Sequence, residues 1–321
     1  MKGDDMQQDH EIIESRKPVR AHFLDDMREI GWEQALRDEQ TLLRLAKPQG
    51  VVLERLRQRF LLDELHIKDI LNPSHPPQFA RLKNGGLHVI LRFPVHSGAE
   101  NESSEVSSVS ILADRKMCAL VWPGERYHHF SSQDLAGLTV EECVCKIVHL
   151  LVDYLLRRVY ALREEMDEFE DECLADAGNA DLGRLLLVRK EFALLARYAR
   201  TNALAIDKLR EDSSYRENLR LIDAHEHMNR ASVIAESRAE HVLSLMQAVQ
   251  SLLSQRLNQV LAFLAVITVI LTPIGVIAGI FGMNFTNMEV LKYPNGFMLA
   301  ISGMLLLAVA LAVIFKIKKW W

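Results

Sequence analysis

Glycine and proline are absent from two long parts of this 321-residue chain. Neither occurs from Leu138 to Ala177, and neither occurs from Arg184 to Thr272. Apolar residues recur in these parts at intervals of three and four, as at Val242, Leu245 and Val249. The pattern predicts two long helices packed as a hairpin, followed by a third helix that continues into the apolar C-terminal region.

Cysteine is scarce, with only Cys118, Cys143, Cys145 and Cys173 in the chain. Cys143 and Cys145 lie two apart in a predicted helix, so they point to different faces and make a poor metal clip or disulfide. We expect all four thiols to be reduced, as suits a cytoplasmic domain. Residues 1–20 are polar and lack the apolar core of a signal peptide, so we expect none.

The sequence also lacks a phosphate-binding loop and a nucleophilic triad. We therefore expect no enzymatic activity and no nucleotide partner. Acidic residues are nearly missing from Gln255 onward, where the net charge is +4. Because the whole chain carries −5, residues 1–254 carry −9. This acidic balance argues against a nucleic-acid partner.

Residues 18–135 have a mixed helix and strand pattern. Strands are predicted at Ala21–Leu24, Leu87–Phe93, Ser107–Leu112 and Met117–Val121. Helices are predicted at Ile30–Leu45 and Val51–Phe60. Proline and glycine predict connectors at Asn72–Pro77, Lys83–Gly86 and His96–Ser104.

Two long apolar runs stand out near the C-terminus, Leu257–Ile280 and Phe297–Phe315. Each is long enough to cross the ~30 Å hydrocarbon core of a bilayer as a helix. The chain therefore reads as a membrane protein with two spans.

The charges that flank these spans predict their orientation. Arg256 precedes the first span, and Lys316, Lys318 and Lys319 follow the second, whereas the connecting loop holds only Lys292. Basic residues are retained on the cytoplasmic side of a membrane. We therefore expect a protein of the inner membrane with both termini in the cytoplasm and the connecting loop on the outer side.

One face of the first span carries mostly polar or small residues at helical spacing. This polar stripe consists of Asn258, Leu261, Ala265, Thr268, Thr272, Gly275 and Gly279. It has two interpretations. Spacing alone favours close helix packing, of which Gly275 and Gly279 are typical, and the alternative is a water-contacting pore wall. In an oligomer both can hold on adjacent faces.

Gly282, Met283 and Asn284 follow the first span directly. An asparagine in such a loop is typical of a turn, since it tolerates left-handed backbone. Repeated around a pore, its amide oxygens would instead form a neutral ring. Such a ring can hold Mg²⁺ through the waters that the ion releases reluctantly, whereas carboxylates would slow its release.

Three segments together resemble the CorA family of magnesium and cobalt channels. They are Leu65–Pro73, Leu221–His227 and Leu271–Phe285, the last of which contains Gly-Met-Asn. The resemblance implies a homopentamer in a lipid membrane, with an α/β cytoplasmic domain, a helical funnel and two spans in each chain.

The expected fold class is therefore an α+β membrane protein in three parts. The α/β cytoplasmic domain would occupy residues 1–137, and the long-helix funnel and stalk would occupy 138–255. The two-span pore domain with its basic tail would occupy 256–321.

The resemblance also implies roles for particular residues. Gly282, Met283 and Asn284 would form the selectivity filter at the outer mouth. The first span would line the pore through Asn258, Leu261, Ala265, Thr268, Thr272 and Gly275. Asp69 and Asp223 match acids that bind regulatory Mg²⁺ between cytoplasmic domains and favour closure. Thr272 and Gly275 depart from the residues common at those positions in the family, which leaves the gate unlocated.

The function implied is a pentameric channel for passive influx of Mg²⁺, also of Co²⁺ and as a further ion Ni²⁺, closed by cytoplasmic Mg²⁺. The alternative function is that of a zinc transporter of the related ZntB type, which could be coupled to protons. A third hypothesis is a membrane-anchored cation sensor that conducts no ions. Met283 favours the channel. His225 and His227 lie two apart on a predicted helix, so we do not expect them to share a cation within one chain.

Overall fold

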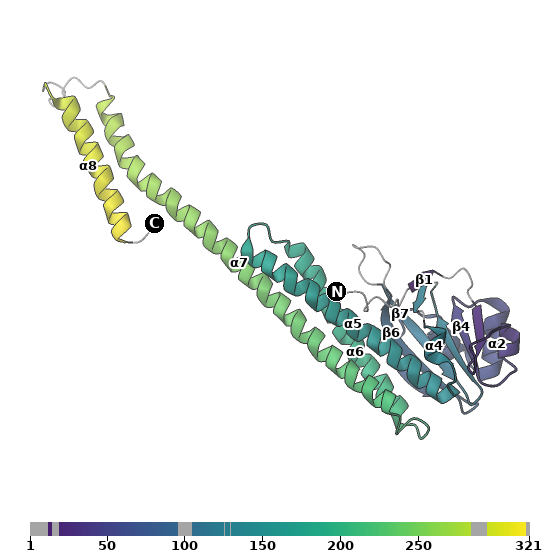
Figure 1. Cartoon of the computed structure of the whole chain (residues 1–321). Coiled ribbons are helices and arrows are strands. Elements are labelled where there is room, and N and C mark those ends of the chain that lie inside the picture. The colour runs from purple at the N-terminus through teal and green to yellow at the C-terminus, as the bar shows by residue number, and fades with distance from the viewer. Residues whose placement is uncertain are drawn as a thin grey trace, which may run out of the picture. The chain divides into compact units, whose positions relative to one another are not determined.

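The computed structural model describes residues 12–14, 19–95, 105–124, 126–128, 130–283 and 294–318. The chain divides into two compact units. The first contains residues 1–171 and 181–244, and the second contains residues 172–180 and 245–321. Figure 1 labels their helices and strands along the chain.

A mixed seven-stranded sheet forms the centre of the first unit, with strand order β3-β2-β4-β8-β7-β6-β5. Its strands are β2 (Val19–Phe23), β3 (Glu29–Ile30), β4 (Thr41–Ala46), β5 (Gln78–Arg81), β6 (Leu87–Val95), β7 (Glu105–Ala113) and β8 (Met117–Trp122). The central pair β4 and β8 is parallel, and the other pairs are antiparallel. Strands β1 (Ile12–Glu14) and β9 (Arg126–His128) pair separately. The four predicted strands are confirmed as β2, β6, β7 and β8.

The helix predicted at Ile30–Leu45 is wrong. The structure has a short helix α1 (Trp32–Ala35) and then strand β4, every residue of which is buried. The Thr41 hydroxyl donates to the Ala35 carbonyl oxygen at 2.8 Å, which fixes the start of the strand against the end of the helix. Because both faces of β4 are covered, its sequence Thr-Leu-Leu-Arg-Leu-Ala lacks the alternation of a half-buried strand, and its period does not distinguish strand from helix.

Helix α2 (Gly50–Phe60) matches the predicted helix, and α3 (Glu64–Leu71) follows after one turn. Asp63 caps α3 by accepting the His66 backbone N–H at 3.0 Å. Phe60 and Ile70 pack on Leu43 and Leu112 of the sheet. The connectors at Asn72–Pro77 and Lys83–Gly86 are confirmed as non-helical turns, and His96–Ser104 lies outside the described residues.

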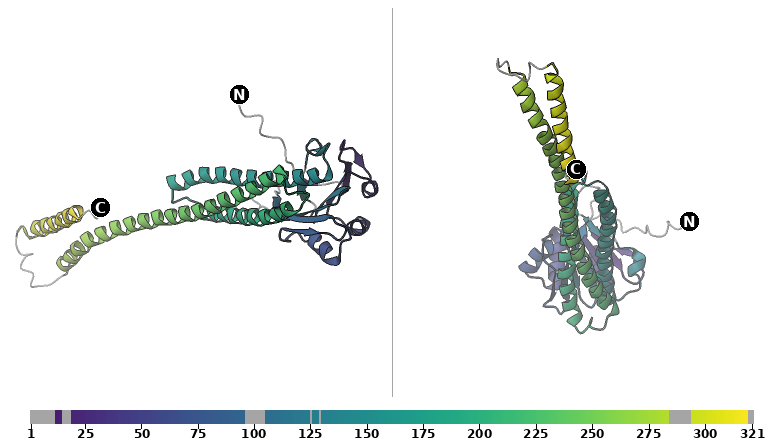
Figure 2. Two further views of the ribbon diagram at one scale, coloured as in Figure 1. Left: turned by 90° about the horizontal axis from the view of Figure 1, so that it is seen from below. Right: turned by 90° about the vertical axis from the view of Figure 1, so that its left-hand side faces the viewer.

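Three long helices follow the short helix α4 (Ser132–Leu135). They are α5 (Val140–Ala175), α6 (Leu182–Glu211) and α7 (Leu219–Phe281). Thr139 and Glu142 start α5 with a reciprocal capping box: the Thr139 N–H donates to the Glu142 carboxylate at 2.9 Å, and the Glu142 N–H donates to the Thr139 hydroxyl at 3.3 Å. Within the first unit these helices run side by side, as Figure 2 shows, which confirms the predicted hairpin and third helix.

The second unit contains the C-terminal part of α7 and helix α8 (Gly296–Ile317). Both helices are long and apolar enough to cross a membrane. In the apolar window of α7 only 6% of the residues are buried, and in that of α8 none are. The core helix of a water-soluble protein would be covered by its own chain, so this exposure fits contact with lipid or with other copies.

Candidate ion pathway and regulatory residues

The polar stripe lies along the described part of α7 that belongs to the second unit. All of its members are exposed in the single chain: Asn258, Leu261, Ala265, Thr268, Thr272, Gly275 and Gly279. A Cβ atom added at Gly275 or Gly279 would have no other atom within 4 Å, apart from the nearby backbone of its own helix. The close helix packing that these glycines permit is therefore not used within one chain, and the stripe is free to face a pore or a neighbouring copy.

The two threonines of the stripe bond to their own helix. The Thr268 hydroxyl donates to the Leu264 carbonyl oxygen at 2.8 Å, and the Thr272 hydroxyl donates to the Thr268 carbonyl oxygen at 2.7 Å. Each hydroxyl has thus used its proton, but its oxygen can still accept hydrogen bonds. This face of the span presents acceptors, which suits contact with the water shell of a cation.

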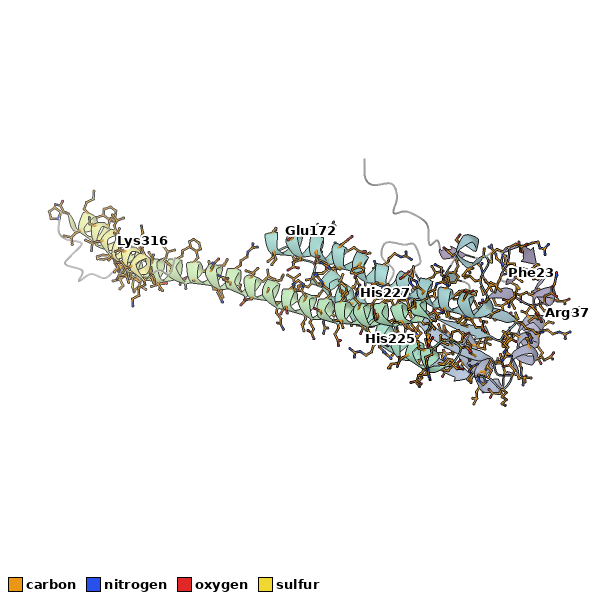
Figure 3. All side chains as sticks on the ribbon, turned by 60° about the horizontal axis from the view of Figure 1, so that its bottom comes forward. Phe23, Arg37, Glu172, His225, His227 and Lys316 are labelled. Atoms are coloured by element: carbon orange, nitrogen blue, oxygen red, sulfur yellow. The ribbon has the colours of Figure 1, made fainter. Side chains whose placement is uncertain are left out.

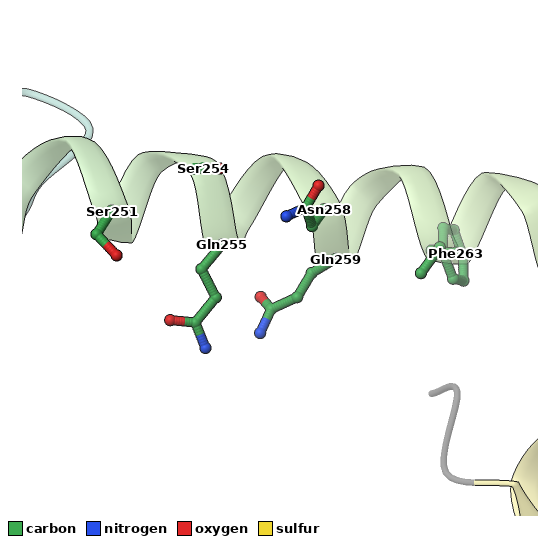
Figure 4. Close-up of a pocket in the computed structure, with 7 residues that line it drawn as sticks. Ser251, Ser254, Gln255, Asn258, Gln259 and Phe263 are labelled. Atoms are coloured by element: carbon green, nitrogen blue, oxygen red, sulfur yellow. The ribbon is translucent and has the colours of Figure 1, made fainter.

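Polar side chains also line a hollow at the N-terminal end of the stripe. Figure 4 shows Asn258 among Ser251, Ser254, Gln255, Gln259 and Phe263 on one stretch of α7. These side chains are uncharged, and three of them carry amide groups. Asn258 belongs both to this hollow and to the polar stripe. Uncharged amides can hold a hydrated cation without the tight binding that carboxylates would impose.

The first two residues of the Gly-Met-Asn segment are bonded to the last turn of α7. The Gly282 N–H donates to the Ala278 carbonyl oxygen at 2.9 Å, and the Met283 N–H donates to the Ile280 carbonyl oxygen at 3.2 Å. Gly282 and Met283 therefore close the last turn of the first span. Asn284 lies outside the described residues, so its role as a filter residue stays a prediction.

Asp223 on α7 belongs to a group of four side chains that we call the His–Asp tetrad: His149 and Asp153 on α5, Asp223 and His227 on α7. His149 Nε2 lies 2.9 Å from Asp223 Oδ2, and His227 Nε2 lies 3.4 Å from Asp223 Oδ1. On the other side, His149 Nδ1 lies 3.0 Å from Asp153 Oδ2, in a contact without the alignment of a hydrogen bond, and His227 Nδ1 lies 3.3 Å from Asp153 Oδ1. Each imidazole thus faces two carboxylates.

The alternation of charge in the tetrad shifts two pKa values. The contact with Asp153, followed by that with Asp223, raises the pKa of His149 despite partial burial. Burial acts to raise the pKa of Asp153, but the bonds from His149 and His227 outweigh it and lower that pKa below its usual range. The contacts therefore favour the charged form of His149 and the ionised form of Asp153.

Asp69 on α3 also contacts a histidine. Asp69 Oδ1 lies 3.1 Å from His75 Nε2, and Asp69 Oδ2 accepts from the Gln78 amide at 3.4 Å. Among their described contacts, Asp69 and Asp223 do not touch each other, so one chain does not bring the two predicted regulatory acids together. Lys68 pairs instead with Glu64 at 3.2 Å, away from Asp69.

The neighbouring histidines of α7 face different helices. His225 approaches Asp207 of α6 at 4.0 Å, whereas His227 contacts Asp153 of α5. Figure 3 labels both residues on α7. The expectation that they would not share a cation agrees with these contacts. Sequence reasoning missed that His227 meets His149, although the paired His-x-x-x-Asp and Asp-x-x-x-His spacings on two predicted helices carried that signal.

Comparisons with known proteins agree with this architecture. The family described as CorA-like Mg²⁺ transporter protein matches residues 42–319. The cobalt/magnesium transport protein CorA of Thermotoga maritima is 25% identical over 286 residues, covering 84% of this chain and 80% of its own. The complete CorA magnesium transporter structure from Methanocaldococcus jannaschii has a TM-score of 0.78 at 17% identity, with 95% of this chain and 99% of that one covered.

A ZntB cytoplasmic domain from Vibrio parahaemolyticus also has a similar fold, with a TM-score of 0.60 at 14% identity. It covers 74% of this chain and 98% of its own. At these identities the two structures establish the fold alone. The predicted α+β architecture, with a mixed-sheet domain, long helices and two C-terminal apolar helices, is that of full-length CorA.

Proposed function

Because this chain belongs to the CorA family of divalent-cation transporters, we propose that it forms a homopentameric channel through which Mg²⁺ enters the cell passively. Co²⁺ is the second transported ion, and Ni²⁺ a further one. The first span lines the pore, and the segment Gly282 to Asn284 forms its outer mouth. A divalent cation that moves inward gains about 4.6 kcal/mol at 100 mV, inside negative, so no nucleotide is needed.

The observation that carries the proposal is the polar stripe on an apolar helix. Thr268 and Thr272 expose hydroxyl oxygens on a helix whose other exposed residues include Val269, Leu271 and Val276. Polar atoms facing lipid would be unfavourable, whereas a water-filled pore between copies satisfies them. Fivefold repetition would turn each stripe position into a ring.

Conduction in this proposal uses the hydrated ion. The amide of Asn284 accepts hydrogen bonds from the waters around Mg²⁺, and neutral oxygens below it pass the ion on without binding it tightly. The flanking basic residues Arg256 and Lys316 support a cytoplasmic position for both termini, with the filter outside.

Regulation in this proposal uses Asp69 and Asp223. A Mg²⁺ ion between neighbouring chains would offset the repulsion of their carboxylates and hold the closed state. In the single chain both acids are already paired with histidines. Regulatory Mg²⁺ must therefore displace, or share a carboxylate with, an imidazole.

The proposal is tested by ion uptake into proteoliposomes loaded with a Mg²⁺-sensitive dye. Wild-type protein is expected to take up Mg²⁺ and Co²⁺, and Asn284→Ala to lose most of that uptake while it still assembles. Asn295→Ala, an amide replacement at the start of α8, is the matched control and should conduct.

The same assay decides between the channel and the ZntB-type alternative. The histidines of the tetrad give the alternative its support, since imidazole is a good ligand for Zn²⁺. Uptake of Zn²⁺ without Mg²⁺, or uptake that requires a proton gradient, would replace the channel proposal with a zinc transporter. If the reconstituted protein takes up none of these cations, it would instead be a cation sensor.

A further inference from the structure

His88 is a buried histidine that has no hydrogen-bond partner for its side chain among the described residues. It lies on β6, opposite Ala80 of β5 and Leu112 of β7, and its exposed fraction is 0%. Both of its ring nitrogens are buried and make no hydrogen bond within the described residues. Leaving a buried polar group unpaired destabilises a fold by about 1–3 kcal/mol. Its neighbours on the adjacent strands, Ala80 and Leu112, are apolar and offer the ring no side-chain hydrogen bond.

The ring nitrogens of His88 are available to a ligand, because neither makes a hydrogen bond within the described residues. An imidazole binds a metal ion through the lone pair of an unprotonated ring nitrogen.

His66 on α3 lies over His88, with ring centroids 5.7 Å apart and an angle of 47° between the rings. Its Nδ1 lies 2.7 Å from Asp63 Oδ1, and Asp63 is itself fixed as the cap of α3. None of the described contacts of His66 uses Nε2. A histidine held through Nδ1 by a carboxylate, with Nε2 free, is the arrangement in which metal-binding histidines are usually found.

A third imidazole and a carboxylate flank this pair. His75 Nε2 contacts Asp69 Oδ1 at 3.1 Å, while its Nδ1 faces the Pro76 carbonyl oxygen at 2.8 Å. Among the described residues, no three His, Cys, Asp or Glu side chains are already arranged around one point as a metal site. His75 and Asp69 would have to turn from each other to contribute, whereas the rings of His66 and His88 already lie 5.7 Å apart, centroid to centroid.

We propose that His66 and His88 form a binding site for a borderline transition-metal ion such as Zn²⁺, Co²⁺ or Ni²⁺, completed by water and by His75 or Asp69 after a side-chain rotation. With metal–nitrogen distances of about 2.0–2.1 Å, two imidazoles on one tetrahedral ion have centroids roughly 5 Å apart. The observed centroid separation of 5.7 Å is close to this value. Imidazole ligands favour these ions over Mg²⁺, which prefers oxygen.

The site is separate in chemistry from the proposed pore, which uses amide and hydroxyl oxygens and water. It would join α3 to β6 and act on the segment that carries Asp69. A transition metal bound there would give the domain a response to Co²⁺, Ni²⁺ or Zn²⁺ that Mg²⁺ does not produce.

The test is zinc retention by the full-length protein in detergent, with millimolar Mg²⁺ present to occupy oxygen-lined sites. After equilibration with micromolar Zn²⁺ and removal of free ion, metal content per chain is measured by mass spectrometry. Wild type is expected to keep about one Zn²⁺ per chain more than His88→Leu, which replaces the imidazole by an apolar side chain suited to its surroundings. His66→Ala is the second variant, and it leaves the sheet untouched.

The matched control is His241→Ala, because His241 is a half-exposed histidine that pairs with Glu170 at 3.5 Å and lies on α7. It should retain as much Zn²⁺ as wild type. X-ray absorption of the wild type should show nitrogen ligands that both site variants lack. Equal zinc content in wild type, His66→Ala and His88→Leu would overturn the proposal. Because the readout is retention rather than uptake, its outcome is independent of whether the channel proposal holds.

Discussion

His149 Nε2 on α5 lies 2.9 Å from Asp223 Oδ2 on α7. The contact joins two helices that are separated by the whole of α6 in the sequence, and the reciprocal contact of Asp153 with His227 repeats it one turn further along. The predicted regulatory acid Asp223 is thus part of the packing of the helical bundle. Loss of this contact would therefore remove one of the links between α7 and α5.

The first prediction is that His149 and Asp223 are energetically coupled. The double variant His149→Ala with Asp223→Ala should be less destabilised than the sum of the single variants. Because the side chain of Asp223 is 47% exposed, we expect a coupling at the low end of the usual range, about 0.5–1 kcal/mol. The measurement is hydrogen exchange of α5 and α7 amides in the metal-free protein.

The exposed pair Arg200 and Glu236 provides the reference, with a 2.6 Å contact between α6 and α7. Side chains this exposed contribute little, about 0.2–1 kcal/mol. Additive single and double variants at His149 and Asp223 would show that their contact has no stabilising role.

The second prediction concerns pH. The folded-state pKa of His149 is raised above its ordinary value of 6.5 by Asp153 and Asp223. The stabilisation it provides is therefore complete below pH 6.5 and is lost as the pH rises through the raised pKa. With metal removed by a chelator, the α5–α7 amides of the wild type should exchange with a lower protection factor at pH 9 than at pH 6, after correction for intrinsic exchange.

His149→Gln should remove this alkaline loss, because glutamine keeps a polar side chain but does not titrate. At the acidic end, Asp153 loses its contribution as the pH falls through its lowered pKa. An unchanged alkaline profile in His149→Gln would assign the pH dependence to other groups.

The long helices and the sheet strands could be predicted because their patterns are local. The absence of glycine and proline between Arg184 and Thr272 predicts α6 and most of α7. The apolar, β-branched and aromatic residues of Met117–Trp122 predict a strand. Strand β4 could not, because Thr41–Ala46 has no strand-like alternation, and only its parallel pairing with β8 decides that it is extended. Here tertiary contacts overrode the local pattern.

The candidate sites divide in the same way. The polar stripe follows from helical spacing, so Thr268 and Thr272 could be placed on one face without a structure. The environment of Asp223 could not, because its partner His149 lies 74 residues away. His88 was not singled out at all, since a lone histidine in a strand carries no spacing, and only its burial reveals it.

The third prediction concerns Asn202, a buried amide that links α6 to the sheet. Its Nδ2 donates to the Arg92 carbonyl oxygen at 2.7 Å, and its Oδ1 accepts from the Arg92 N–H at 2.9 Å. Asn202→Ala would leave both backbone groups of β6 unpaired, which should cost about 2–4 kcal/mol. The readout is the urea midpoint of the full-length protein in detergent.

Thr201→Ala is the control, because the Thr201 hydroxyl bonds only to carbonyl groups of its own helix. Its effect should stay within about 0.5 kcal/mol. If the two variants unfold at the same urea concentration, the Asn202 bridge does not hold α6 on the sheet.

The last prediction concerns Thr272 in the polar stripe. Its hydroxyl proton is committed to the Thr268 carbonyl oxygen, so its only remaining contribution to a pore is an acceptor for water. Thr272→Val keeps the shape and removes that acceptor. If the stripe faces hydrated Mg²⁺, the loss of about 1 kcal/mol in one ring of contacts should lower uptake several-fold.

Ser302→Ala removes a hydroxyl from α8 instead and should leave uptake unchanged, since the proposed pore is lined by the first span. Flux assays with both variants at equal protein content decide the matter: equal uptake would place Thr272 at a helix contact and return the stripe to its packing interpretation.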